Sequence, residues 1–215
     1  RVARDAGTVP GKTPWSKIVG PEARSQTFLN LTPGSTYTLS VEAINAVGTG
    51  PAASGQVTIA VPVTNLLKNP GFELDANADS RPDSWTSNAK FTRSSAVKYA
   101  GSYAGQHRAT NNTGHTITQV VTALTAGVNY GFSGRVNIPA TTDAFTFQIR
   151  VRWRNSSNTV IRTDVVRTDT AATSGWNQVV RTMTSPTGAT NAQVQMVATS
   201  LNATVYVDDF ALSRS

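Results

Sequence analysis

The chain of 215 residues contains no cysteine, which excludes disulfide-stapled folds, thiol nucleophiles and cysteine-ligated zinc. Charged residues are also scarce, at 14%, while 39% of the residues are hydrophobic. That balance is too apolar for a disordered chain and too poor in charge for a coiled coil. No apolar run approaches the roughly 20 residues of a membrane-spanning helix. The surface must therefore consist mainly of uncharged polar residues, which is typical of extracellular all-β proteins.

Motifs of catalysis and nucleotide binding are missing as well. The sequence has no nucleophile elbow, phosphate loop or dinucleotide fingerprint, and its two histidines, His107 and His115, lack metal-ligand spacing. Lysine and arginine outnumber the acidic residues by 19 to 12, but they are spread along the chain without an aromatic-interleaved stripe. We therefore predict that the protein is not an enzyme and does not bind nucleic acid.

What the sequence does contain is a series of alternating apolar and polar runs, which predicts an all-β fold. The clearest predicted strands are Thr36 to Ala43, Asn129 to Ile138 and Phe145 to Arg154. In the last of these, the apolar side chains share one face and the Gln and Arg side chains share the other. One buried and one wet face indicate an antiparallel sandwich or barrel.

The composition changes at Val61-Pro62-Val63-Thr64, where a proline that cannot donate to a strand ladder is followed by an Asn-rich segment. We place a domain boundary there, giving domains 1–64 and 65–215. Their formal charges are +2, from 5 basic and 3 acidic residues, and +5, from 14 and 9. The positive charge is thus distributed over both domains.

In the first domain, the stretch from Leu31 to Pro51 (LTPGSTYTLSVEAINAVGTGP) resembles the second half of a fibronectin type III domain. Tyr37 is placed like that family's corner tyrosine, whose hydroxyl ties back to the backbone. The resemblance implies a spacer with an immunoglobulin-like β-sandwich. Such domains need about 90 to 100 residues, and here the match begins with what looks like the third strand, Arg1 to Arg4. We expect that either a longer chain or a neighbouring chain supplies the missing strands.

In the second domain, several short motifs occur in order: NLLKNPGFE from Asn65, Trp85, AGSYAGQHRAT from Ala100, LTAGVNY from Leu124, GWNQV from Gly175 and VYVDDFAL from Val205. Together they resemble the carbohydrate-binding modules of families four, nine and twenty-two. The resemblance implies a jelly-roll β-sandwich that binds polysaccharide on the solvent face of one sheet. It also implies a structural calcium ion.

The candidate metal ligands are acidic residues near the two ends of this domain. Alternation places Asp208 with Tyr206, Phe210 and Leu212 on one face, where an unpaired carboxylate is costly. Glu73 follows Phe72 in the opening motif, and pairing of the first and last strands would bring Glu73 beside Asp208. Ca²⁺ accepts such oxygens, with carbonyls of the loop Lys98 to Ser102 implied as further ligands. Two alternatives stay open: Asp209 replaces Asp208, or Lys98, an arginine or backbone amides satisfy the acids without metal.

The candidate ligand-binding residues are rich in arginine and amides: Arg135, Gln148, Arg150, Arg152, Gln193 and Gln195, with Tyr103 and His107 on neighbouring segments. Arginine side chains match carboxylate and sulfate groups, so an anionic polysaccharide is a plausible partner. The alternative is that alternating arginines only solvate a strand face. The rings best placed for a sugar are those of Tyr99, Tyr103 and Phe91, whereas Trp85, Trp153 and Trp176 are expected to pack.

We therefore predict non-catalytic capture of a polysaccharide by a secreted bacterial protein, extracellular or at the cell surface. The alternative is a structural or adhesive subunit of an extracellular fibre or phage tail, with a neighbouring chain completing the first domain. For the acid pair Glu73 and Asp208, glycoside hydrolysis is disfavoured because both are expected under the core rather than in a cleft.

Overall fold

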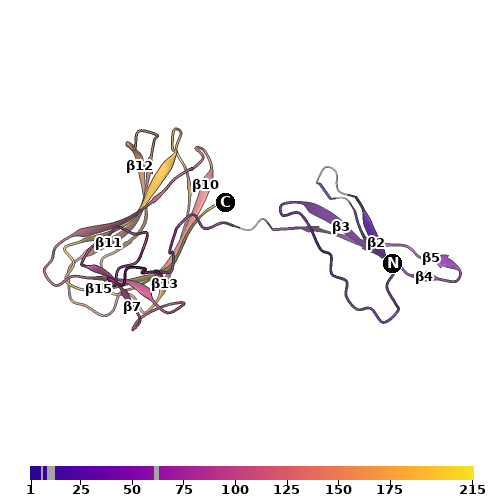
Figure 1. Cartoon of the computed structure of the whole chain (residues 1–215), viewed down its shortest axis with the longest axis horizontal. Coiled ribbons are helices and arrows are strands. Elements are labelled where there is room, and N and C mark those ends of the chain that lie inside the picture. The colour runs from indigo at the N-terminus through magenta and orange to yellow at the C-terminus, as the bar shows by residue number, and fades with distance from the viewer. Residues whose placement is uncertain (6, 9–12, 61–62) are drawn as a thin grey trace. The chain divides into compact units, whose positions relative to one another are not determined.

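The computed structural model describes residues 1–5, 7–8, 13–60 and 63–215. The chain forms two compact units, Arg1–Pro62 and Val63–Ser215. The predicted boundary falls partly on Val61 and Pro62, which lie outside the described residues. All regular secondary structure in the described ranges is β-strand, in agreement with the all-β prediction (Figure 1). No helix that could span a membrane is found in this part of the chain.

The first unit contains one antiparallel sheet, with strand order β2-β1-β3-β6, and a small hairpin of β4 and β5. Its strands are β1 (Val2–Arg4), β2 (Trp15–Lys17), β3 (Thr36–Val41), β4 (Ile44–Asn45), β5 (Gly48–Thr49) and β6 (Ala53–Thr58). Tyr37 is 1% exposed, and its hydroxyl accepts a hydrogen bond from the backbone N–H of Thr32 over 2.9 Å.

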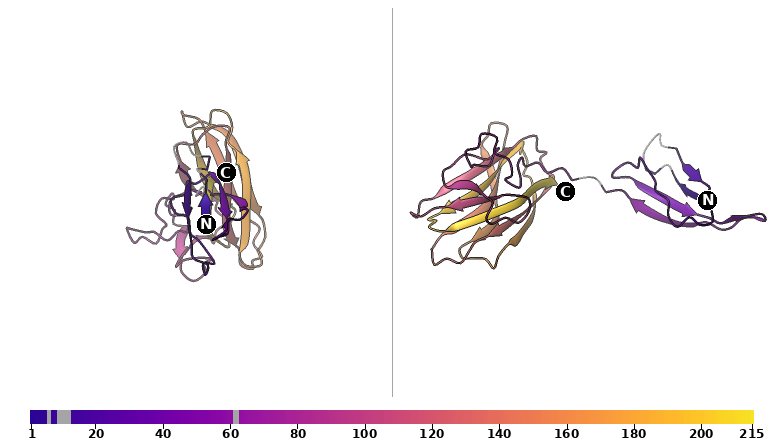
Figure 2. Two further views of the ribbon diagram at one scale, coloured as in Figure 1. Left: turned by 90° about the vertical axis from the view of Figure 1, so that its right-hand side faces the viewer. Right: turned by 60° about the horizontal axis from the view of Figure 1, so that its bottom comes forward.

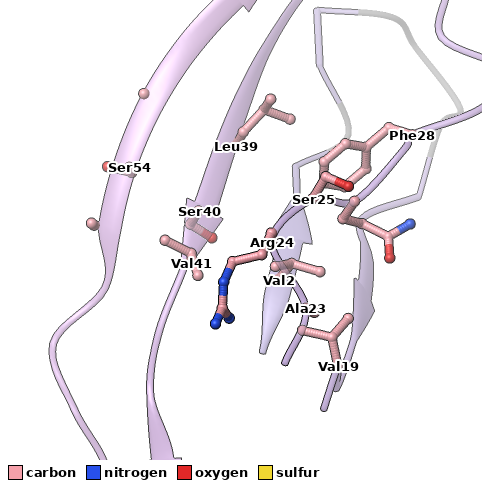
Figure 3. A pocket seen from close by; sticks show the side chains of 13 residues that line it. Val2, Val19, Ala23, Arg24, Ser25, Phe28, Leu39, Ser40, Val41 and Ser54 are labelled. Carbon is pink, nitrogen blue, oxygen red and sulfur yellow. The ribbon is translucent and has the colours of Figure 1, made fainter. Parts of the chain in front are cut away.

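One face of this sheet is only partly covered. A cavity of about 480 Å³ lies between the sheet and residues 19–28, and Val2, Phe28, Leu39 and Val41 are among the residues that line it (Figure 3). Beside the cavity, Phe28 packs edge to face against Trp15 with ring centroids 5.3 Å apart. The first unit therefore has apolar side chains on an open sheet face, and its resemblance to fibronectin type III stays a prediction.

The second unit is a sandwich of two antiparallel sheets. A five-stranded sheet has the order β13-β10-β15-β8-β7, and a four-stranded sheet has the order β12-β11-β14-β9 (Figures 1 and 2). The strands are β7 (Phe91–Ser94), β8 (Ala104–Arg108), β9 (His115–Val121), β10 (Asn129–Asn137), β11 (Thr146–Arg154), β12 (Val160–Asp169), β13 (Asn177–Thr184), β14 (Asn191–Thr199) and β15 (Thr204–Arg214). This is the jelly-roll β-sandwich that was predicted.

Side chains from the inner faces of both sheets form one continuous core. Its aromatic centre includes Phe72, Phe132 and Phe210, with the ring of Phe210 5.4 Å from Phe72 and 5.2 Å from Phe132. The segment before β7 runs along β15, because Leu66 donates to the carbonyl of Leu212 and Phe210 to that of Pro70. The two ends of the second unit are therefore joined by backbone hydrogen bonds.

A bulge in β15 changes the predicted facing of its side chains. Asp209 has a φ of 52°, and the register between β10 and β15 shifts between Ser133 and Arg135. As a result Val207 and Phe210 both point into the core, at 0% and 1% exposure. The prediction that Tyr206 shares a face with Phe210 was wrong, because strict alternation does not continue through the bulge.

Candidate functional site

Strand β11 places a row of arginines on the outer face of the four-stranded sheet. Its inward side chains are fully buried in the core, and the outward ones between them are half-buried. Strand β14 pairs with it so that Arg150 lies opposite Gln195 and Arg152 opposite Gln193. We call the resulting surface the arginine–glutamine face; it comprises Gln148, Arg150, Arg152, Arg154, Asn191, Gln193 and Gln195.

Amide oxygens hold the three guanidinium groups in place. The Nε atom of Arg150 donates to Gln148 Oε1 over 2.7 Å, and that of Arg154 donates to Asn191 Oδ1 over 2.7 Å. The contact of Arg152 with Gln193 is longer, at 3.4 Å. Two glutamines of this face are themselves anchored by threonines. Gln148 donates to Thr168 over 3.0 Å, and Gln195 donates to Thr118 over 3.2 Å.

This face carries positive charge without an acidic partner. Among the described residues, no carboxylate forms an ion pair with Arg150, Arg152 or Arg154. The acids of the adjacent strand β12 are engaged elsewhere, since Asp164 and Asp169 pair with arginines of β12 itself. A guanidinium has five N–H donors, so each of the three keeps donors for a ligand. The arrangement suits carboxylate or sulfate groups spaced along a polymer.

The strands that flank the arginines add some apolar surface. Val120 on β9 is 48% exposed and Val165 on β12 is 36% exposed, and Val165 lies opposite Arg150 in the sheet register. No aromatic residue occupies an outward position on the four described strands of this sheet. Binding here would therefore depend on hydrogen bonds and charge rather than on ring stacking.

The structure brings together five of the predicted ligand-binding residues and separates the other three. Gln148, Arg150, Arg152, Gln193 and Gln195 share the arginine–glutamine face. Arg135 lies on β10, in the other sheet. Tyr103 precedes β8, where the guanidinium carbon of Arg93 lies 4.2 Å from its ring centroid. Asn191 and Thr118 were not predicted as ligand-binding residues, although both side chains lie on the outward side of their strands.

The prediction that His107 contacts ligand was wrong. Its side chain is 0% exposed and packs between Phe91 and Phe147, with ring centroids at 4.4 and 5.2 Å. The inward register of β8, in which Gly105 lies against core side chains, puts His107 on the core side. Phe91 is 1% exposed, so it is also not available to a sugar.

The two histidines form a buried pair. His107 Nδ1 lies 3.0 Å from His115 Nε2, and His107 Nε2 lies 3.3 Å from the sulfur of Met196. Burial lowers the pKa of His107 well below 6.5, and the neighbouring His115 lowers it further. Burial also lowers the pKa of His115, with a further contribution from Lys90. Both imidazoles are therefore kept neutral in the folded state, which suits a packing role.

The predicted metal ligands Glu73 and Asp208 do meet at one loop. Glu73 Oε1 accepts hydrogen bonds from the backbone N–H groups of Ser102 and Tyr103, at 3.0 and 3.2 Å. Asp208 Oδ2 accepts from Tyr99 and Ala100, at 2.8 and 3.0 Å. Asp208 is 1% exposed, and burial raises its pKa against the opposing effect of three backbone N–H donors. The charge of Glu73 also raises this pKa, but it is the smallest of these effects.

Asp208 rather than Asp209 is the buried acid of this pair. The side chain of Asp209 is exposed because the bulge turns it away from the core. Backbone N–H groups of the loop 99–103 donate to both carboxylates, which is the arrangement that the metal-free alternative predicts. Two carboxylates brought together under partial desolvation nevertheless fit a hard cation, since each carboxylate offers about four lone-pair sites. No group of three or more acidic or histidine side chains surrounds a common point within the described ranges.

No protein-family model matches the chain, and no curated protein matches its sequence. Solved structures match in fold. The CBM22-1 xylan-binding domain of Xyn10C from Paenibacillus barcinonensis is 16% identical, with 72% of this chain and 97% of that chain covered and a TM-score of 0.54. The C-terminal family 22 carbohydrate binding module of Clostridium thermocellum Xyn10B is 18% identical, with 67% and 90% covered and a TM-score of 0.51.

The enzymatically active domain of tailspike protein 4 from bacteriophage CBA120 also matches, at 12% identity and a TM-score of 0.55. That likeness covers 74% of this chain, and the chain spans only 22% of the tailspike domain. All of these identities are low, so the likenesses show the fold alone: the jelly-roll β-sandwich found in carbohydrate-binding modules.

Proposed function

We propose that the second unit captures an anionic polysaccharide without catalysis, on the arginine–glutamine face. The observation that carries the proposal is the row of three arginines on β11 whose side-chain partners are amides rather than acids. Preformed guanidinium groups at alternate strand positions repeat about every 7 Å, which suits acidic groups repeated along a polymer. The shared fold with carbohydrate-binding modules supports the same function.

Affinity electrophoresis tests this proposal with a neutral xylan, a polyuronate and a sulfated polysaccharide in separate gels. We expect the two acidic polymers to retard the protein, with less retardation as salt screens the charges. The double variant Arg150→Gln and Arg152→Gln should be retarded much less than the wild type. Arg108→Gln is the matched control, because Arg108 is exposed on the other sheet. Retardation of the double variant equal to that of the wild type would show that the polymer binds elsewhere.

We also propose a structural Ca²⁺ bound by Glu73 and Asp208. The support is that the two carboxylates converge on the loop 99–103, and that burial and the charge of Glu73 both raise the pKa of Asp208. A bound cation would fix this loop against β15 and so stabilise the two ends of the unit. It has no catalytic part in the proposal.

The second candidate function is a structural subunit of an extracellular fibre or tail. Two observations favour it: the fold likeness to a phage tailspike domain and the open apolar face of the first unit. In this arrangement strands from a neighbouring segment or chain would cover Val2, Phe28 and Leu39. Sedimentation over a range of concentrations tests it. Assembly that increases with concentration, together with no retardation by any polysaccharide, would favour the fibre over capture.

For the whole chain, the proposed context is a secreted bacterial protein, extracellular or at the cell surface, with residues 1–62 as a spacer. The composition supports this context, since charged residues make up only 14% of the chain and cysteine is absent. Capture by the second unit would raise the local concentration of whatever is linked to it.

A further inference from the structure

The outer face of the five-stranded sheet carries two aromatic rings and an arginine that the proposed site does not use. Tyr99 lies in the loop before β8, Trp176 directly precedes β13 and Arg135 lies on β10. The guanidinium carbon of Arg135 is 4.3 Å from the centroid of the Tyr99 ring. The Tyr99 and Trp176 centroids are 5.9 Å apart, at an interplanar angle of 66°. We call these three side chains the ring–arginine cluster.

The cluster is open to solvent, unlike the other tryptophans of the second unit. Tyr99 is 44% exposed and Trp176 is half-buried, whereas Trp85 and Trp153 are 6% and 0% exposed. The neighbouring strand adds Gln178, which lies opposite Arg135 and is exposed. Two rings, a guanidinium and an amide are therefore reachable from one side of the sheet.

The indole N–H of Trp176 and the guanidinium of Arg135 have no hydrogen-bond or ion-pair partner within the described part of the chain. The buried tryptophans use their indole N–H groups, since Trp85 donates to Asn69 over 3.2 Å and Trp153 to Asp164 over 2.7 Å. For Trp176, and for the guanidinium of Arg135, no hydrogen bond or ion pair to a described residue occurs. Half-buried donors without partners are free to bind a ligand.

The cluster is also held in a fixed position. The backbone N–H of Tyr99 donates to Asp208 Oδ2 over 2.8 Å, which ties the loop to β15. Asp208 lies opposite Arg135 in the sheet, but its oxygens accept three backbone N–H groups and no bond from Arg135. The charge of Arg135 therefore remains available to an anion in solution.

We propose that the ring–arginine cluster is a second saccharide site, which takes an acidic sugar. The indole of Trp176 stacks on the apolar face of the sugar ring, Arg135 binds its carboxylate as a bidentate pair, and Gln178 bonds a hydroxyl. The choice of a sugar rests on the proposed function, while the site itself rests on these contacts. Because the arginine–glutamine face lies on the other sheet, one unit would hold two polymer segments and could cross-link them.

The test removes the first site and asks whether binding remains. In the double variant Arg150→Gln and Arg152→Gln, calorimetric titration with an oligogalacturonate should still show one saturable site. Adding Trp176→Ala or Arg135→Gln to that background should weaken binding about tenfold or more. Adding Arg108→Gln, which removes the same charge from the same sheet, should leave affinity unchanged. Melting midpoints establish that each variant is folded.

The outcomes separate the two proposals. No saturable binding in the double variant would overturn the second site and leave capture on the arginine–glutamine face intact. Binding in that background that is insensitive to both Trp176→Ala and Arg135→Gln would also overturn it. Conversely, a wild-type protein that loses all binding through Trp176→Ala alone would support the cluster and overturn the first site.

Discussion

The hydroxyl of Tyr130 accepts a hydrogen bond from the backbone N–H of Thr125, five residues earlier, over 2.9 Å. In the first unit, Tyr37 and Thr32 have the same relationship and the same distance. Both tyrosines are buried, at 3% and 1% exposure, and each follows the pattern Leu-Thr-x-Gly-x-x-Tyr. In both units, therefore, a hydrogen bond to a buried tyrosine hydroxyl fixes the loop that leads into a strand.

Replacing Tyr130 by Phe tests this corner. The ring would still pack against Trp153, but the N–H of Thr125 would lose its acceptor. We expect the free energy of unfolding to fall by about 1 kcal/mol, measured by urea denaturation. Tyr103→Phe is the control, because the Tyr103 hydroxyl has no hydrogen-bond partner among the described residues. Equal losses in the two variants would contradict a specific role for the Tyr130 hydroxyl.

Gly101 is the residue that allows the acid pair to reach its loop. It has a φ of 60°, and a Cβ there would lie 2.0 Å from Glu73 Oε1. Gly101→Ala should strain the backbone and push the carboxylate from the amides of Ser102 and Tyr103. Gly127→Ala is the control, because Gly127 has a φ of 73° and no atom lies within 4 Å of the added Cβ. This variant therefore introduces backbone strain without a steric clash. We expect Gly127→Ala to cost about 1 kcal/mol and Gly101→Ala about 1 to 3 kcal/mol more. Equal costs would show that Glu73 moves freely.

Removal of calcium tests the proposed metal site. If Ca²⁺ binds the folded state, adding it should raise the melting midpoint and a chelator should lower it. At a free Ca²⁺ concentration 100 times the dissociation constant, binding would raise the free energy of unfolding by about 2.7 kcal/mol. Glu73→Gln should abolish the difference. Asp209→Asn should retain it, because Asp209 is the exposed neighbour of the buried Asp208. Identical midpoints with and without chelator would leave backbone amides as the only partners of these acids.

Alternation in the sequence predicted an antiparallel sandwich or barrel and the outward facing of the arginines on β11, whereas the jelly roll was implied by the resemblance to carbohydrate-binding modules. It succeeded on β11 because nine residues run without a bulge on the β14 side, so Arg150 and Arg152 remain outward throughout. It failed on β15, because Asp209 adopts the left-handed conformation and forms a bulge there. The residue types of Asp208-Asp209-Phe210 did not predict this bulge. A single bulge changes the facing of every residue beyond it.

Pairing between distant segments was harder to predict than facing. The sequence alone could not say that Arg135 belongs to the five-stranded sheet and Arg150 to the four-stranded sheet, since both lie on outward positions of arginine-bearing strands. His107 is buried because of the register of β8. The polar neighbours Gln106 and Arg108 gave no sign that the side chain between them points into the core. For the same reason the convergence of Tyr99, Trp176 and Arg135 could be seen only in three dimensions.

The buried histidine pair predicts a loss of stability in mild acid. The pKa values of His107 and His115 are lowered in the folded state from 6.5, chiefly by burial. Their contribution to stability is therefore fully present above pH 6.5. Below pH 6.5 the two histidines become protonated in the unfolded chain but stay neutral in the folded chain. The free energy of unfolding therefore falls by about 1.4 kcal/mol per pH unit for each histidine, until the pH reaches the pKa of that histidine in the folded state.

Urea denaturation between pH 8 and pH 5.5 measures this slope. His115→Gln removes one of the two groups, so the variant should lose less stability per pH unit than the wild type over the same interval. The difference between the two curves isolates the histidines from the carboxylates, which both proteins share. Parallel curves would mean that His115 titrates alike in the folded and unfolded states, and that its burial does not hold it neutral.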